Sequence, residues 1–143
     1  IICWKKIEMI SIAICTYCSR EKQETPGVLP AGERYKSKRI KEIQQLASAK
    51  GRPFLILSGK YGLLDSGSPI PFYDHLLQKE EVEWLIKKVS KQLSALNIKQ
   101  LDYYTISHNQ DPNLIPYLDC IQGAAELAKA SINIHFISKN IDA

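Results

Sequence analysis

Runs of apolar residues separated by mixed polar segments predict an alternating order of strands and helices along the chain. Residues 7–15 (IEMISIAIC) are apolar at nearly every position and rich in isoleucine, which is typical of a strand buried on both faces. Shorter apolar runs at 54–57, 101–106 and 132–137 predict three more strands. We therefore expect a sheet of about four strands.

Between these runs, apolar positions recur with the spacing of helices. Residues 35–50 show this spacing and are followed by the helix-stopping triplet GRP. In residues 82–96 the apolar positions follow i, i+3, i+4, i+7, i+11 and i+14, with glutamates in the first turn. A third helix is expected to open at Asp111-Pro112 or at Ile115-Pro116, because proline is tolerated in a first turn, and to run to about Lys129.

Strands that alternate with helices imply a parallel sheet with right-handed crossovers. We expect an α/β fold, a three-layer sandwich in which a mainly parallel sheet of about four strands carries helices on both faces. A length of 143 residues suits one domain. Met9 stands directly before the first apolar run, so we assign residues 1–8 to an N-terminal extension and residues 9–143 to a single α/β domain.

Two long segments follow the first and second predicted strands. Residues 18–34 contain Pro26, Gly27, Pro30 and Gly32, and this density of chain breakers predicts a loop without regular structure. A second long loop is predicted from residue 58 to about residue 78. Because ligands in open α/β sheets bind beyond the carboxyl ends of strands, both loops are candidates for a binding site.

Charge and hydropathy narrow the classes of function. Lys and Arg number 19 against 15 Asp and Glu, and the excess is spread along the chain, so nucleic-acid binding is permitted but not demanded. No apolar run approaches the roughly 18 to 20 residues of a membrane span. The first residues also lack the cleavage site of a secretory signal. We expect a cytoplasmic protein without a membrane role.

The first loop opens with the sequence CSREK, residues 18–22. Ser19, Arg20 and Lys22 together offer a hydroxyl and two cations for a phosphate or carboxylate, with the arginine able to bind it through two parallel hydrogen bonds. A solvated run of charges is the alternative interpretation.

The second loop opens with SGKYGLL, residues 58–64. Gly59 and Gly62 permit close approach of a ligand to the backbone, and Lys60 can face an anion as a point charge. The spacing of the glycines differs from that of a Walker phosphate loop. A plain turn with a solvated lysine is the alternative.

These elements, taken together, resemble the domain-of-unknown-function family 6884. The resemblance covers residues from about 10 to 77 and departs from the family at Gly59, where alanine is usual, and at Phe72, where proline is common. The matching positions are Cys18, Ser19 and Lys22, then Ala31, Tyr35 and Ser37, then residues 58–64, and finally Ile70, Phe72, Tyr73 and Asp74.

Two weaker resemblances point to nucleic-acid chemistry. The Cys-Ser-x-x-Lys pattern is similar to one in archaeosine synthase, a transfer RNA modification enzyme, and the Ser-x-Lys element after a strand is similar to peroxide-stress proteins that bind DNA. The resemblances imply a nucleoside or nucleic-acid neighbourhood and not a specific reaction. Polar and aromatic residues also converge at one sheet edge, so our leading hypothesis is an enzyme that acts on a nucleoside, nucleotide or modified nucleobase, by glycosidic-bond or base-modification chemistry. We expect no cofactor.

Residue roles follow from this hypothesis. Asp74 is the candidate catalytic carboxylate, able to act as a base or to stabilise an oxocarbenium-like charge. Lys60 is a candidate nucleophile if burial lowers its pKa, and Ser58 stands beside it. His108 follows the third predicted strand at the same sheet edge and is a candidate acid or base, with a loop histidine of no special role as the alternative. The predicted ligand-binding residues are Ser19, Arg20, Lys22, Tyr35, Ser37, Gly59, Tyr61, Gly62 and Tyr73.

Two other functions stay open. A non-catalytic nucleic-acid-binding module would use the same lysines and tyrosines for phosphate contact and base stacking. A metal-assisted enzyme would use Cys15 and Cys18, whose spacing fits half of a zinc site. Cys15 ends a buried strand and no second paired motif exists in the sequence, so we expect no metal or redox site.

Overall fold

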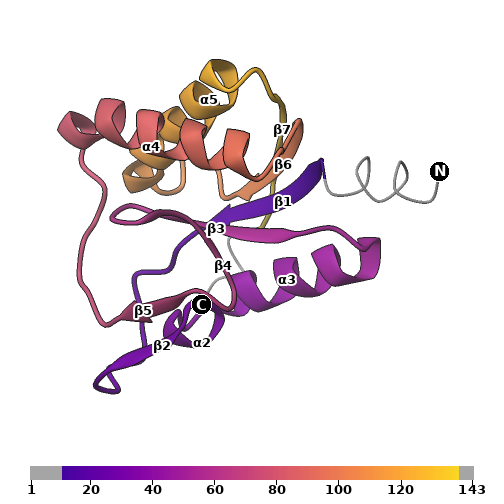
Figure 1. Ribbon diagram of the computed structural model, residues 1–143. Helices are drawn as coiled ribbons and strands as arrows, with labels where there is room; N and C mark the ends of the chain where they lie inside the picture. Colours follow the sequence, from indigo (N-terminus) through magenta and orange to yellow (C-terminus); the bar gives the residue numbers. More distant parts are fainter. Residues whose placement is uncertain (1–10, 139–143) are drawn as a thin grey trace.

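Strand β1 (Ile12–Tyr17) occupies the centre of a five-stranded sheet with the order β4-β3-β1-β6-β7 (Figure 1). The computed structural model describes residues 11–138. Strand β4 pairs antiparallel with β3, and the other neighbours are parallel. The remaining strands of this sheet are β3 (Phe54–Ser58), β4 (Gly62–Asp65), β6 (Gln100–Thr105) and β7 (Ser131–Phe136). The predicted α/β fold with a mainly parallel sheet is confirmed, but the sheet has five strands rather than about four.

Both faces of β1 are buried, as its apolar run predicts. Ala13 and Cys15 belong to a core cluster that also contains residues of helices α4 (Val82–Ala95) and α5 (Ile115–Leu127). Ile14 instead packs with Ile43 and Ala47 of helix α3 (Lys38–Lys50). Successive side chains of a strand point to opposite faces, so helix α3 covers one face and helices α4 and α5 lie over the other (Figure 1). The strand ends at Tyr17, two residues beyond its predicted end.

The helices follow the predicted periodicities, with small shifts at their starts. Helix α3 begins after Ser37, whose side chain accepts a hydrogen bond from the Ile40 N–H at 3.1 Å, and not at residue 35. Both predicted openings of the third helix are used, since a 3-10 turn precedes the helix. The bounds are α3 (Lys38–Lys50), α4 (Val82–Ala95) and α5 (Ile115–Leu127), with the 3-10 turns η1 (Lys79–Glu81) and η2 (Pro112–Leu114).

The two segments predicted as loops contain regular structure, so that expectation was wrong. The first holds β2 (Val28–Pro30) and α2 (Ala31–Arg34), and the second holds β4 and β5 (Pro69–Pro71). Strands β2 and β5 form an antiparallel ribbon outside the main sheet. Proline is tolerated in such edge strands, because one side of each needs no N–H donor. The breaker residues therefore mark a ribbon and not an irregular loop.

A buried arginine fastens this ribbon to the preceding loop. Arg34 is fully buried, and its guanidinium donates hydrogen bonds to the carbonyl oxygens of Gln23, Thr25, Gly27 and Ile70. The backbone adds a bond from the Gln23 N–H to the Arg34 carbonyl at 2.7 Å. The first loop is thus ordered around one guanidinium group.

Residues 1–8, the predicted N-terminal extension, lie outside the described part of the chain. Within residues 11–138, no helix combines the length and the apolar character that crossing a bilayer requires. The proposed division into an extension and one domain stays a prediction.

Candidate functional site

The connections that leave β1 and β6 diverge at the carboxyl edge of the sheet. Strand β1 leads through α3 on one face to β3, while its neighbour β6 leads through α5 on the other face to β7 (Figure 1). This divergence makes the space between β1 and β6 a topological switch point, where open α/β sheets bind their ligands.

A pocket of about 380 Å³ opens at this switch point. One wall consists of residues 17–22, which follow β1, and the opposite wall consists of residues after β6, among them Asp111, Asn113 and Tyr117. Residues 74–76 close a third side. The predicted site at the carboxyl end of β1 thus coincides with a pocket, but the partner strand is β6 and not β3.

Lys22 is held inward by backbone pairing. It forms an isolated antiparallel bridge with Tyr35, and the Lys36 N–H donates to the Glu21 carbonyl at 2.9 Å. Its Nζ donates to the Arg20 carbonyl at 3.3 Å, and the side chain lines the pocket although the residue is only 9% exposed. Burial lowers the pKa of Lys22, an effect that the nearby Cys18 and Asp74 partly oppose.

Ser58 and Lys60 lie beside the pocket rather than in its lining. Ser58 is fully buried, and its Oγ accepts hydrogen bonds from the N–H groups of Lys60 at 3.1 Å and Tyr61 at 3.0 Å. These bonds occupy both Oγ lone pairs, so the hydroxyl donates to Tyr73 Oη, 2.9 Å away. Lys60 is exposed. The burial that its nucleophilic role required is found at Lys22 instead.

Tyr73 joins the two loops. Lys22 Nζ from the first loop lies 4.6 Å from the centroid of its ring, and Lys60 Nζ from the second lies 5.8 Å from it. The Tyr73 hydroxyl also forms a hydrogen bond with the Tyr35 hydroxyl, and the Tyr61 ring meets Tyr73 edge-on at 5.1 Å. The two loops therefore converge, as their sequences predict.

The environment of these tyrosines does not suit the stacking role predicted for them. Tyr35 is 1% exposed and Tyr73 is 5% exposed, so their faces are covered by protein. Burial is also the largest influence on their hydroxyls and raises the pKa of both, which keeps them neutral. The aromatic rings that line the pocket belong to Tyr17 and Tyr117.

The predicted glycines and Ser37 have packing roles in the structure. A Cβ on Gly59 would lie 2.9 Å from Tyr117 Oη, so this position accepts no side chain without movement of its neighbours. Gly62 has a left-handed φ of +77° at the start of β4, beside the side chain of Gln92. Ser37 caps helix α3. Gly59, Gly62 and Ser37 do not line the pocket.

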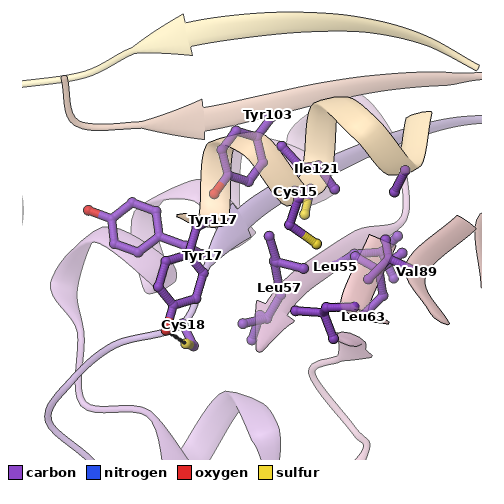
Figure 2. Packing of buried hydrophobic residues seen from close by; sticks show 14 of the residues in the cluster. Cys15, Tyr17, Cys18, Leu55, Leu57, Leu63, Val89, Tyr103, Tyr117 and Ile121 are labelled. Atoms are coloured by element: carbon purple, nitrogen blue, oxygen red, sulfur yellow. Dashed lines mark hydrogen bonds between the residues drawn. The ribbon is translucent and has the colours of Figure 1, made fainter. Parts of the chain in front are cut away.

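Sequence reasoning missed Tyr117 as a member of the site, where it contacts Cys18, the first residue of the predicted CSREK segment. The Cys18 thiol donates to Tyr117 Oη at 3.9 Å (Figure 2). The Leu77 N–H donates to the same oxygen at 3.2 Å. Burial raises the pKa of Tyr117. Tyr117 gave no signal in the sequence, because it falls on the apolar face of a helix like any core residue. Figure 2 shows Cys15 deeper in the core, away from this contact.

No family model, curated protein or solved structure matches this chain. The resemblance to family 6884 therefore stays a prediction, and the case for the site rests on its geometry.

Arg39, also missed, fixes the β1 wall of the pocket. Its guanidinium lies 3.6 Å from the centroid of the Tyr17 ring and donates to the carbonyls of Tyr17 at 2.8 Å and Cys18 at 3.3 Å. The residue is fully buried. The sequence held a signal for this role. Arg39 lies on the same side of α3 as the buried Ile43 and Ala47, and an arginine that is buried needs hydrogen-bond acceptors inside the protein.

Two remaining candidates fall outside the pocket. His108 is exposed in the turn after β6 and does not line it. Cys15 belongs to the core, where burial raises its pKa, and Cys120 beside it has a pKa raised to about 12. Within residues 11–138, no group of three or more His, Cys, Asp or Glu side chains is arranged to hold a metal ion. Asp74, in contrast, is exposed and lines the pocket.

Proposed function

We propose that the domain is an enzyme that binds a nucleoside, nucleotide or modified nucleobase in the pocket at the switch point. The observation that carries this proposal is the combination of cationic and aromatic side chains in that one pocket. Arg20, Lys22 and Lys36 can face an anionic group. Tyr17 and Tyr117 are 6% and 3% exposed, so they contribute apolar lining and not a free stacking face. A volume of about 380 Å³ suits one small molecule and not a folded polymer.

The chemistry of the reaction is assigned to two side chains of the lining. Asp74 can accept a proton or stabilise positive charge on a sugar ring, as glycosidic-bond cleavage requires. Lys22, whose pKa is lowered by burial, presents a larger neutral fraction than an exposed lysine and can act as a base or a nucleophile. In this proposal Ser58 is a positioning residue, because its hydroxyl is hydrogen-bonded to that of Tyr73. Lys60 lies at the edge of the site. The cytoplasmic location expected from the sequence suits this function.

Binding of small nucleosides and nucleotides tests the proposal. We expect at least one member of a panel of the four ribonucleosides and their 5′-monophosphates to bind the full chain in isothermal titration calorimetry. Lys22→Met should weaken that binding at least about tenfold, because it removes a charged contact. Lys79→Met is the matched control, since Lys79 lies in a separate groove beside η1 and α5. Absence of binding, or equal weakening by both variants, would contradict the proposal.

A nucleic-acid-binding module is the second candidate, favoured by the exposed cations near the pocket. Arg20 and Lys36 are exposed on its rim, and exposed Lys60 lies within reach of Tyr73. This function predicts that oligonucleotides bind and mononucleotides do not, with an affinity that falls steeply as the salt concentration rises. Titrating a single-stranded 12-mer at two salt concentrations distinguishes the candidates.

A further inference from the structure

A histidine and a glutamate meet on the third side of the pocket. His75 lines the pocket, and its Nε2 lies 3.0 Å from Glu81 Oε1 and 2.9 Å from Oε2. His75 follows Asp74 directly in the sequence, so an imidazole and a carboxylate enter the site from the same segment.

Glu81 is not a loosely placed surface carboxylate. Its Oε1 also accepts the Gln78 N–H at 2.9 Å, as the glutamate of a capping box at the start of η1. The position of the carboxylate is thereby set by the backbone that begins helix α4. A histidine paired with a carboxylate fixed in this way has its ring orientation fixed as well.

This pairing decides which ring nitrogen a ligand can meet. An Nε2–H that donates to Glu81 leaves the lone pair of Nδ1 as the acceptor of the neutral ring. We propose that His75 is a further catalytic residue of the pocket, a general acid–base beside Asp74 and Lys22, and that Glu81 is its positioning residue. The proposal rests on the proposed function, because it requires a ligand in this pocket.

The proton transfer is simple and balanced. Nδ1 of neutral His75 accepts a proton from a water molecule as the water oxygen bonds to the anomeric carbon of the bound nucleoside or nucleotide and the bond from that carbon to the base breaks. The proton on Nε2 stays in the hydrogen bond to the Glu81 carboxylate throughout. The same Nδ1–H then returns the proton to the leaving group or to the product. No oxidant, reductant or metal takes part.

A second histidine provides a matched control. His135 Nε2 also lies at hydrogen-bonding distance from a carboxylate oxygen, Asp102 Oδ1, at 3.1 Å. Its ring stacks on Tyr104 at 4.5 Å, and Arg52 and Asn133 share the same carboxylate. His135 does not line the pocket. The two histidines thus have the same kind of partner and differ in access to the ligand.

The test compares three variants of the full chain with the nucleoside or nucleotide that binds it best in the panel above. We expect His75→Gln to keep its dissociation constant within about threefold of the wild type and to lose turnover by about 100-fold or more. Glu81→Gln keeps a side chain that suits a capping box but loses the carboxylate charge. It should lower kcat about tenfold with KM and Tm little changed. His135→Gln should leave turnover unchanged.

Chemical modification supplies a readout that does not depend on turnover. Diethyl pyrocarbonate acylates neutral imidazole, and peptide mapping by mass spectrometry follows each histidine separately. Saturating ligand should slow acylation of His75 at least about tenfold and leave His135 unaffected.

The outcomes separate the two proposals. If the ligand binds and His75→Gln retains turnover, or if bound ligand leaves acylation of His75 unchanged, the role of His75 is refuted while the proposed function stands. A ligand that binds without turnover by the wild type refutes catalysis by His75. If no member of the panel binds, the proposed function fails, and the role of His75 falls with it. A fall in Tm together with the loss of turnover in Glu81→Gln would assign Glu81 a structural role only.

Discussion

The hydroxyl of Tyr103 lies in the core with no hydrogen-bond partner among residues 11–138. Burial raises the pKa of this tyrosine well above its usual value. A buried polar group without a partner costs about 1 to 3 kcal/mol. We expect Tyr103→Phe to raise the free energy of unfolding by about 1 kcal/mol, measured by urea denaturation.

Tyr73→Phe is the comparison for that prediction. The Tyr73 hydroxyl is bonded to Ser58 and Tyr35, so its removal leaves buried partners unsatisfied. We expect a loss of about 1 to 2 kcal/mol. A Tyr103→Phe protein that is destabilised as much as Tyr73→Phe would show that the Tyr103 hydroxyl has a partner in solution.

At the same scale, residue type alone did not separate the two lysines of the site. Lys22 and Lys60 each follow a strand and a serine, and both approach Tyr73. Only the pairing of residues 21–23 with 34–36 turns Lys22 inward, and that pairing joins segments that the sequence presents as one irregular loop.

At the scale of elements, Arg34 determines whether the β2–β5 ribbon and the loop before it hold their shape. We expect Arg34→Met to lower the free energy of unfolding by about 2 kcal/mol or more, because a charged donor to four carbonyls is lost. Limited proteolysis should then cut within residues 23–27 faster than in the wild type.

Two further variants sharpen this prediction. Arg34→Lys keeps the charge without the forked donors and should lie between wild type and Arg34→Met. Arg20→Met, at an exposed arginine, should change stability by no more than about 0.5 kcal/mol. If Arg34→Met and Arg20→Met lowered the free energy of unfolding equally, the stabilising role of the Arg34 hydrogen bonds would be contradicted.

The helices and the parallel strands were predictable as elements because their signals are local. The helical spacing in residues 82–96 and the apolar run that ends at Cys15 can be recognised without knowing how the elements pack. The short strands β2, β4 and β5 were not predictable. They have three or four residues each and contain proline or begin with glycine, so their pairing depends on contacts made elsewhere.

At the scale of the whole molecule, Lys22 links stability to pH. Its pKa is below 10.5 in the folded protein and returns to about 10.5 on unfolding. Between these two values the unfolded chain binds more protons, so this group favours the folded state increasingly as the pH rises. We expect wild type to gain stability relative to Lys22→Met from neutral pH toward pH 10.5.

The measurement is urea denaturation of both proteins at several pH values. Burial raises the pKa of Tyr35, Tyr73 and Tyr117, so these groups oppose the trend only where an unfolded tyrosine ionises, near about pH 10. Lys22 Nζ lies over the Tyr35 and Tyr73 rings, so their contribution differs between the two proteins, and the comparison is made below about pH 9. A difference that stays constant across this range would mean that Lys22 is solvated in the folded protein.

The sequence by itself determined the class of fold, the order of the long elements and one wall of the site. These follow from periodicity and from the position of residues 18–22 after a strand. Only the tertiary structure decided that the opposite wall comes from β6, that Ser58, Tyr35 and Tyr73 are buried supports, and that His75 lines the pocket. The reason is physical: a switch point is made by crossovers on opposite faces of the sheet, and no local pattern records which strands become neighbours.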